Sequence, residues 1–229
     1  MTRRRLTPMP ALLASAAVFA GGCAGLPEAR VPVPPELQSL APERITGLGG
    51  GRSGSLALSG LTGRYERSAD RLTLFDLVSR DRAGVSLATQ DAQGRSTTMS
   101  CRGAQTEVSA GVIAASARPW RYTCTSSGAL QGELTLEGQR AAAATRDERR
   151  GSWNAPGARL ELRSLHQWEG AVLPVPQPVG YVVLDAGRPV GLLELNGPAP
   201  RLWRPAADSP LRPHVTQALL ALALVWDPA

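Results

Sequence analysis

The chain has 229 residues, of which 25 are basic and 19 acidic, so its formal net charge is +6 at pH 7. Every basic residue is arginine, and the arginines are scattered, with one cluster at 146–150 that two acidic residues interrupt. Because nucleic-acid binding needs a continuous basic stripe or patch, this class of partner is excluded.

The N-terminus has three parts in a fixed order. Three arginines at 3–5 precede an apolar run at 11–20, and Gly21 and Gly22 stand just before Cys23. This order is typical of an export signal. The apolar run is too short to cross about 30 Å of hydrocarbon as a helix, so a membrane-spanning anchor is disfavoured.

Residues 1–23 resemble the signal of a bacterial lipoprotein. The resemblance implies that 1–22 are removed as a signal peptide and that the thiol of Cys23 carries a diacylglycerol. Ala20 departs from the leucine that is commonest at its position. Ala24 is not aspartate, which in the Gram-negative version of this family implies a place on the periplasmic face of the outer membrane. The alternative is an ordinary secretory signal with a cysteine near its cleavage site by chance.

A tether is predicted over 23–53. Residues 24–44 contain five prolines and little apolar periodicity, a pattern typical of extended chain rather than of packed structure. At about 3.1 Å per residue, twenty such residues would hold the folded part up to about 60 Å from the membrane.

The globular part is predicted over 54–229 and is mainly β. Short runs rich in valine, threonine and leucine recur about every ten residues, for example at 55–58, 85–88 and 181–184. Two segments, 91–94 and 185–188, have the composition of hairpin turns. The spacing favours a single antiparallel barrel or sandwich of about 11–13 short strands over alternating βαβ units.

Cys101 and Cys124 form an even pair once Cys23 is set aside. In a chain exported to an oxidising space, this number predicts a disulfide between them. The competing interpretation, a reactive thiol or part of a metal site, lacks a second cysteine or a histidine at the usual spacing.

One hydrophobic helix is predicted over 209–226. Ser209 is its expected N-cap, followed by Pro210, and ten of the twelve residues at 215–226 are apolar. A helix without a polar stripe must be surrounded, either by the β-structure or by a partner, and we favour the β-structure. In element order, with its apolar C-terminal stretch at 218–225, the domain resembles tubby-like and scramblase-like barrels. That resemblance implies a closed barrel that encloses its C-terminal helix.

Motifs for chemistry are few. The glycines at 49–54 match the spacing G-x-G-x-x-G, but proline-containing chain precedes them and a strand follows, so they are interpreted as a linker. His166 and His214 are the only histidines and the only catalytic candidates. They lie too far apart in sequence to suggest a metal site, and no cofactor is expected.

Two functions of different classes follow. The first is a non-enzymatic lipoprotein whose β-domain binds an envelope protein or an apolar ligand. The second is an envelope hydrolase or transferase with its site around His166. The second function requires a pocket that contains His166 or His214 with an acidic or hydroxyl neighbour.

Overall fold

The chain is described by a computed structural model over residues 29–74, 78–110, 113–139 and 146–225. Cys23, the signal segment predicted over 1–22, and Trp226 lie outside the described residues. In chain order, the elements are η1 (Pro35–Leu37), β1 (Glu43–Arg44), β2 (Ser53–Leu58), β3 (Leu61–Leu74), β4 (Val78–Asp91), β5 (Ser96–Ala110), β6 (Ile113–Gly128), β7 (Gly132–Gln139), β8 (Glu148–Ala155), β9 (Ala158–Leu165), β10 (Gly180–Asp185), β11 (Arg188–Glu194), β12 (Arg201–Trp203) and α1 (Arg212–Ala223).

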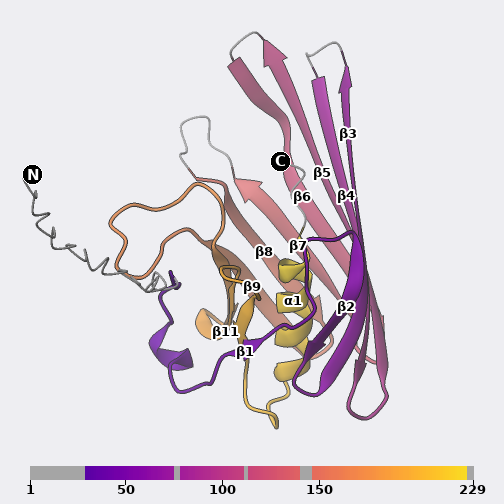
Figure 1. The fold of residues 1–229 in the computed structure, drawn as a ribbon, viewed down its shortest axis with the longest axis vertical. Coiled ribbons are helices and arrows are strands. Elements are labelled where there is room, and N and C mark those ends of the chain that lie inside the picture. The colour runs from indigo at the N-terminus through magenta and orange to yellow at the C-terminus, as the bar shows by residue number, and fades with distance from the viewer. Residues whose placement is uncertain (1–28, 75–77, 111–112, 140–145, 226–229) are drawn as a thin grey trace, which may run out of the picture.

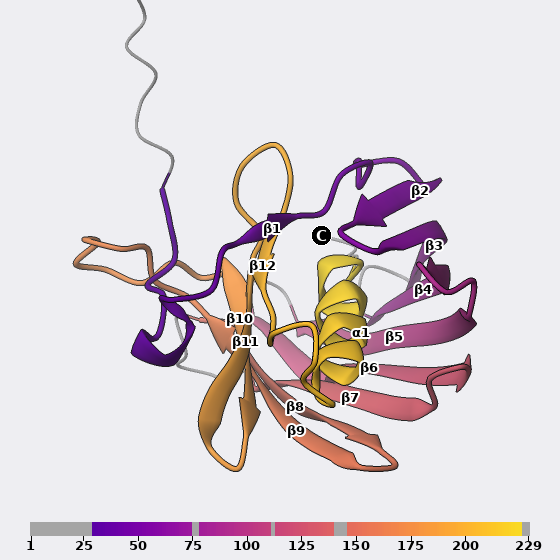
Figure 2. The same ribbon diagram turned by 90° about the horizontal axis from the view of Figure 1, so that it is seen from below.

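The twelve described strands form one antiparallel sheet. From β2 to β12 each strand pairs with its neighbours along the chain, and β1 pairs with β12. A bridge between Thr46 and Ala57 joins the segment after β1 to β2, so the sheet curls into a nearly closed barrel (Figure 2). The predicted mainly β fold is confirmed, and the described strands fall within the predicted number.

Period-two alternation decides which side chains face the interior. In β9, Leu160 and Leu162 are buried, whereas Arg159, Glu161 and Arg163 are exposed. Successive side chains of a strand point to opposite faces, so the inner face is apolar and the outer face polar.

Helix α1 lies inside the curve of the sheet (Figure 2). Every residue from Val215 to Leu224 is buried, which explains why the helix carries no continuous polar stripe. At its C-terminal end, the hydroxyl of Tyr122 donates a hydrogen bond of 3.4 Å to the carbonyl of Ala221. Burial raises the pKa of the Tyr122 hydroxyl, so this group stays a neutral donor.

The helix begins later than the sequence predicted. Ser209 is not its N-cap, because the hydroxyl and the carbonyl of Ser209 accept the amide protons of Leu211 and Arg212 in a separate turn. The helix therefore starts at Arg212, with Pro213 in its first turn, where a missing N–H is tolerated.

Four strands are longer than expected. The strands β3 to β6 run for 14 to 16 residues and extend past the end of α1 as two long hairpins (Figure 1). The sequence at 81–84, Asp-Arg-Ala-Gly, has the composition of a turn but lies inside β4. Its register with β3 runs without a break from Asp91 to Val78. Cross-strand pairing on both sides therefore outweighs the local turn preference.

Both predicted hairpin turns are present. Between β10 and β11, Ala186 and Gly187 have φ of 48° and 79°, which is the left-handed pair of a two-residue hairpin. Between β4 and β5, the carboxylate of Asp91 accepts the amide protons of Gln93 and Arg95.

Much of the tether predicted over 23–53 is packed structure. Residues 29–46 form a strap that runs along the outside of the barrel, where Val31 and Leu37 pack against Leu192 and Trp203. Because the strap covers its outer face, the C-terminal end of β11 is buried on both faces. The periodicity of the sequence did not indicate this. The six residue-to-residue steps from Cys23 to Ala29 can span about 20 Å at most, well below the predicted 60 Å.

Cys101 and Cys124 form the predicted disulfide. They are directly opposite each other in β5 and β6, with 3.9 Å between their Cα atoms, and both are buried.

Arg204 holds the two ends of the barrel together. Its guanidinium donates to both carboxylate oxygens of Glu43 in β1 at 2.8 and 2.6 Å, and to the carbonyl of Ser59 beyond β2 at 2.9 Å. It also donates to the hydroxyl of Thr216 in α1 at 3.2 Å. Arg212 reaches Glu43 from the helix at 3.0 Å. Partial burial alone would raise the pKa of Glu43, but hydrogen bonds and charge from the two arginines hold it below its usual value.

We expect Arg204→Met to lower the free energy of unfolding by about 3 kcal/mol, because it removes one partner of a buried charged network. Urea unfolding followed by tryptophan fluorescence measures the change. Arg121→Met is the matched control, because Arg121 pairs with Glu137 in an exposed bridge and its loss should cost less than about 1 kcal/mol. Equal losses in the two variants would contradict the role of Arg204.

Candidate functional site

The barrel interior is occupied by the chain's own helix. The side chains of α1 form one apolar core with inward-facing residues of the sheet, among them Leu87, Trp153 and Leu193. The hollows that the structure gives for the described residues lie instead along the sheet and at its outer side.

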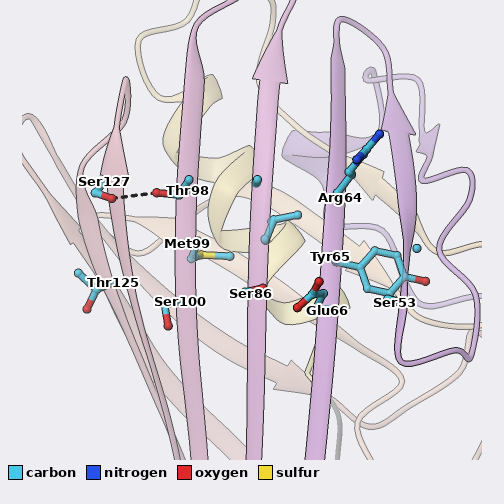
Figure 3. A pocket seen from close by; sticks show the side chains of 13 residues that line it. Ser53, Arg64, Tyr65, Glu66, Ser86, Thr98, Met99, Ser100, Thr125 and Ser127 are labelled. Atoms are coloured by element: carbon cyan, nitrogen blue, oxygen red, sulfur yellow. Dashed lines mark hydrogen bonds between the residues drawn. The ribbon is translucent and has the colours of Figure 1, made fainter.

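Two neighbouring hollows follow the outer side of β2 to β6. They measure about 710 and 590 Å³ and share Arg64, Ala88 and Thr98. We call them together the outer groove. Figure 3 shows its first half, where short hydroxyl side chains from adjacent strands stand side by side and Thr98 contacts Ser127 at 3.0 Å. The exposed hydroxyl residues of this half are Ser53, Ser86, Thr98, Ser100, Thr125 and Ser127.

Charge in the outer groove is confined to one edge. Arg64 and Glu66 are exposed there on β3, and the remaining exposed side chains of the first half are small and neutral (Figure 3). Such a surface offers many hydrogen-bond donors and acceptors.

A third hollow, of about 330 Å³, lies where β8 and β9 meet the β9–β10 loop. We call it the basic pocket. Arg146, Arg150 and Arg163 line it together with His166, and Pro32 of the strap closes one side. The sequence showed only an interrupted cluster at 146–150, because the contribution of Arg163 depends on the pairing of β8 with β9.

Arg149 points the other way from its neighbours. Its guanidinium is buried over the ring of Trp120 at 4.3 Å, and it binds the carboxylate of Asp147 at 2.6 Å and the hydroxyl of Tyr181 at 3.4 Å. This alternation is what a strand imposes on consecutive residues. Arg149 therefore holds the start of β8 in place, while Arg150 faces outward.

His166 lies in the basic pocket with a hydroxyl neighbour. Its Nε2 is 2.8 Å from Oγ of Ser164, and its Nδ1 is 3.1 Å from the carbonyl of Val175. A carbonyl only accepts, so Nδ1 carries the proton and Nε2 accepts from Ser164. Oγ of Ser164 in turn accepts the amide proton of Arg149 at 2.8 Å.

Sequence reasoning missed Ser164. It required an acidic or hydroxyl neighbour for His166 but did not name one. The available signal was the spacing of Ser164 and His166, because residues two apart at the end of a strand share a face.

His214 is not part of the basic pocket. It lies in the first turn of α1, where its Nδ1 accepts a hydrogen bond of 3.3 Å from the indole of Trp153. Partial burial lowers the pKa of His214. The two histidines are thus in different places. Within the described residues, no group of three or more histidine, cysteine, aspartate or glutamate side chains could hold a metal ion.

His214 gives stability a defined pH dependence. Folding lowers the pKa of His214, so as the pH falls the unfolded chain takes up the proton before the folded chain does. The folded state is therefore destabilised as the pH falls below about 6.5, the ordinary pKa of histidine. We expect His214→Gln, which keeps an acceptor but does not titrate, to show a smaller fall in melting temperature between pH 7.5 and 5.0 than the unmodified chain. Parallel curves for the two proteins would contradict this assignment.

Among the described residues, no helix has the length and apolar character needed to cross a membrane. Comparison with protein-family models, with curated proteins and with solved structures finds no match for this chain. The resemblances to lipoprotein signals and to tubby-like barrels therefore stay predictions. The function proposed below rests on the geometry of the outer groove and the basic pocket.

Proposed function

We propose that the protein is a non-enzymatic lipoprotein of the cell envelope, anchored by acyl chains on Cys23 to the periplasmic face of the outer membrane. Its β-domain binds another envelope protein through the outer groove. The supporting observation is the contrast between a barrel interior occupied by α1 and two hollows on the outer side of β2 to β6. Binding of an apolar ligand inside the barrel would first require α1 to leave.

The chemistry of the outer groove suits a protein partner. Hydroxyl side chains present both donors and acceptors, and their small size leaves strand backbone close to any partner that docks there. A surface with a few charges at its edge and neutral polar groups at its centre resembles a transient interface more than an obligate one.

We expect a photo-crosslinking amino acid at Thr98, in the outer groove, to capture an envelope protein in intact cells. The same amino acid at Arg188, in the β10–β11 turn, is the control and should capture little. In the same cells, Cys23→Ser should move the protein from the membrane fraction to the soluble fraction and remove acyl chains detectable by mass spectrometry.

The two parts of this experiment fail separately. A Cys23→Ser protein that stays membrane-bound with unchanged mass contradicts the lipid anchor. Equal crosslinking from Thr98 and Arg188, or none from either, contradicts the outer groove as the binding surface.

A second function is favoured by the contact between Ser164 and His166. In an ester hydrolase, Oγ of Ser164 would attack the acyl carbon while its proton passes to Nε2 of His166. The imidazole would then give that proton to the leaving alcohol, and water would release the acid by the same transfers in reverse order. The carbonyl of Val175 holds the imidazole in the tautomer that this step needs.

If this second function holds, a fluorophosphonate probe labels the unmodified protein and fails to label Ser164→Ala. His166→Gln should lower ester hydrolysis by a factor of about 100 or more, because it removes the general base. Ser127→Ala, in the outer groove, is the control and should be labelled normally. Labelling that persists in Ser164→Ala, or is absent from the unmodified protein, would exclude the hydrolase.

A further inference from the structure

The β9–β10 loop, residues 166–179, presents a bare apolar tip. Val172 and Leu173 are 90% and 77% exposed, and they are the only exposed large hydrophobic side chains among the residues whose side chains the structure describes. The tip is held rather than loose. The amide of Ala171 binds the carbonyl of Trp168 at 3.0 Å, and the amide of Val175 binds the carbonyl of His166 at 2.7 Å. The fold therefore keeps two apolar side chains in solvent.

The basic pocket lies at the base of the same loop. Arg150 and Arg163 are directly opposite each other in β8 and β9, an arrangement that is unfavourable for like charges. Each has a carboxylate on its own strand, Glu148 at 3.5 Å and Glu161 at 2.8 Å. Arg146 adds a third exposed guanidinium. Glu137 of β7 also lies opposite Arg150, but it pairs with Arg121, so the three arginines of the pocket outnumber Glu148 and Glu161. The excess positive charge would be neutralised by an anion bound between the strands.

The strap starts on the same side of the barrel. The carbonyl of Arg30 accepts the amide proton of Glu169 in the loop at 2.6 Å, and the amide of Asn196 binds the carbonyl of Ala29. Both ribbon views place the loop beside the start of the strap (Figures 1 and 2). Ala29, where the described chain begins, therefore lies next to the apolar tip and the basic pocket.

We infer that these features form one membrane-docking face, in which the basic pocket binds the phosphate group of an anionic phospholipid and the loop tip enters the bilayer surface. Apolar side chains bury into the boundary between headgroups and acyl chains, and nearby arginines gain from anionic lipid. The choice of a lipid over a soluble phosphate rests on the proposed anchor. A lipid on Cys23 would keep this face at the membrane, because Ala29 can lie at most about 20 Å from Cys23.

Co-sedimentation with vesicles tests the docking face. The full-length chain carrying Cys23→Ser is used, so that no acyl anchor contributes, and residues 1–28 contribute equally to every variant. Vesicles contain phosphatidylglycerol and phosphatidylcholine at one to three, or phosphatidylcholine alone. We expect preferential binding to the anionic vesicles, weakened as the salt concentration rises.

Two double variants separate the parts of the face. Arg150→Gln with Arg163→Gln should weaken binding to anionic vesicles about 30-fold. Val172→Ser with Leu173→Ser should weaken it about tenfold or more, through lost apolar burial. The matched control, Arg95→Gln with Arg188→Gln, removes the same charge from two hairpin turns and should bind normally. Melting temperatures confirm that each variant is folded.

Three outcomes overturn the inference. The first is equal loss in the control and in the pocket variant, which would reduce the effect to net charge. The second is undiminished binding of the pocket variant. The third is equal binding to the two kinds of vesicle, which would mean that the face does not select an anionic lipid. Loss of the Cys23 anchor in cells leaves this assay unaffected, so the two proposals fail independently.

Discussion

The barrel depends on the contact between Arg204 and Glu43. Every strand pairing except that of β1 with β12 joins neighbours along the chain. Without the link from β12 through the short β1 to β2, the sheet would remain open. The planar guanidinium binds the carboxylate with two parallel hydrogen bonds and still reaches a carbonyl of the β2–β3 turn and a hydroxyl of α1. A lysine has a single ammonium group and could not hold these groups in the same fixed geometry. One side chain thus fixes the first strands, the last strand and the helix relative to each other.

The position of the strap follows from that closure. Because β1 is held at the seam, the residues before it are directed across β11 and β12, where Val31 and Leu37 cover apolar side chains that would otherwise face water. Below the strap, Glu194 is buried, accepts the amide proton of Val31 at 3.1 Å and pairs with Arg201. A buried carboxylate with both partners in place is satisfied, whereas the loss of either partner would leave an uncompensated charge. The proline-rich segment is therefore a fixed part of the domain, and it determines where the chain leaves the barrel.

Local signals predicted the regular parts of this fold, and long-range pairing decided the rest. Period-two alternation, the two hairpin turns, the even cysteine pair and the apolar helix were all visible in the sequence. The length of β4 was not, because its Asp-Arg-Ala-Gly segment has turn composition and only pairing with β3 and β5 keeps it extended. The basic pocket was also missed. A signal for it existed, because a two-residue turn at Pro156-Gly157 fixes the register that places Arg150 opposite Arg163. The contact of His166 with the carbonyl of Val175 depends on a loop conformation that no periodicity reports.

The order of translation gives α1 a further significance. The helix that completes the core is made after all twelve strands, so a nascent chain has a broad apolar concave surface and nothing of its own to cover it until residue 224 has emerged. The pairing of β1 with β12 likewise joins residues about 160 positions apart, and such distant contacts form late. A chain that stops before α1 thus cannot reach its final packing.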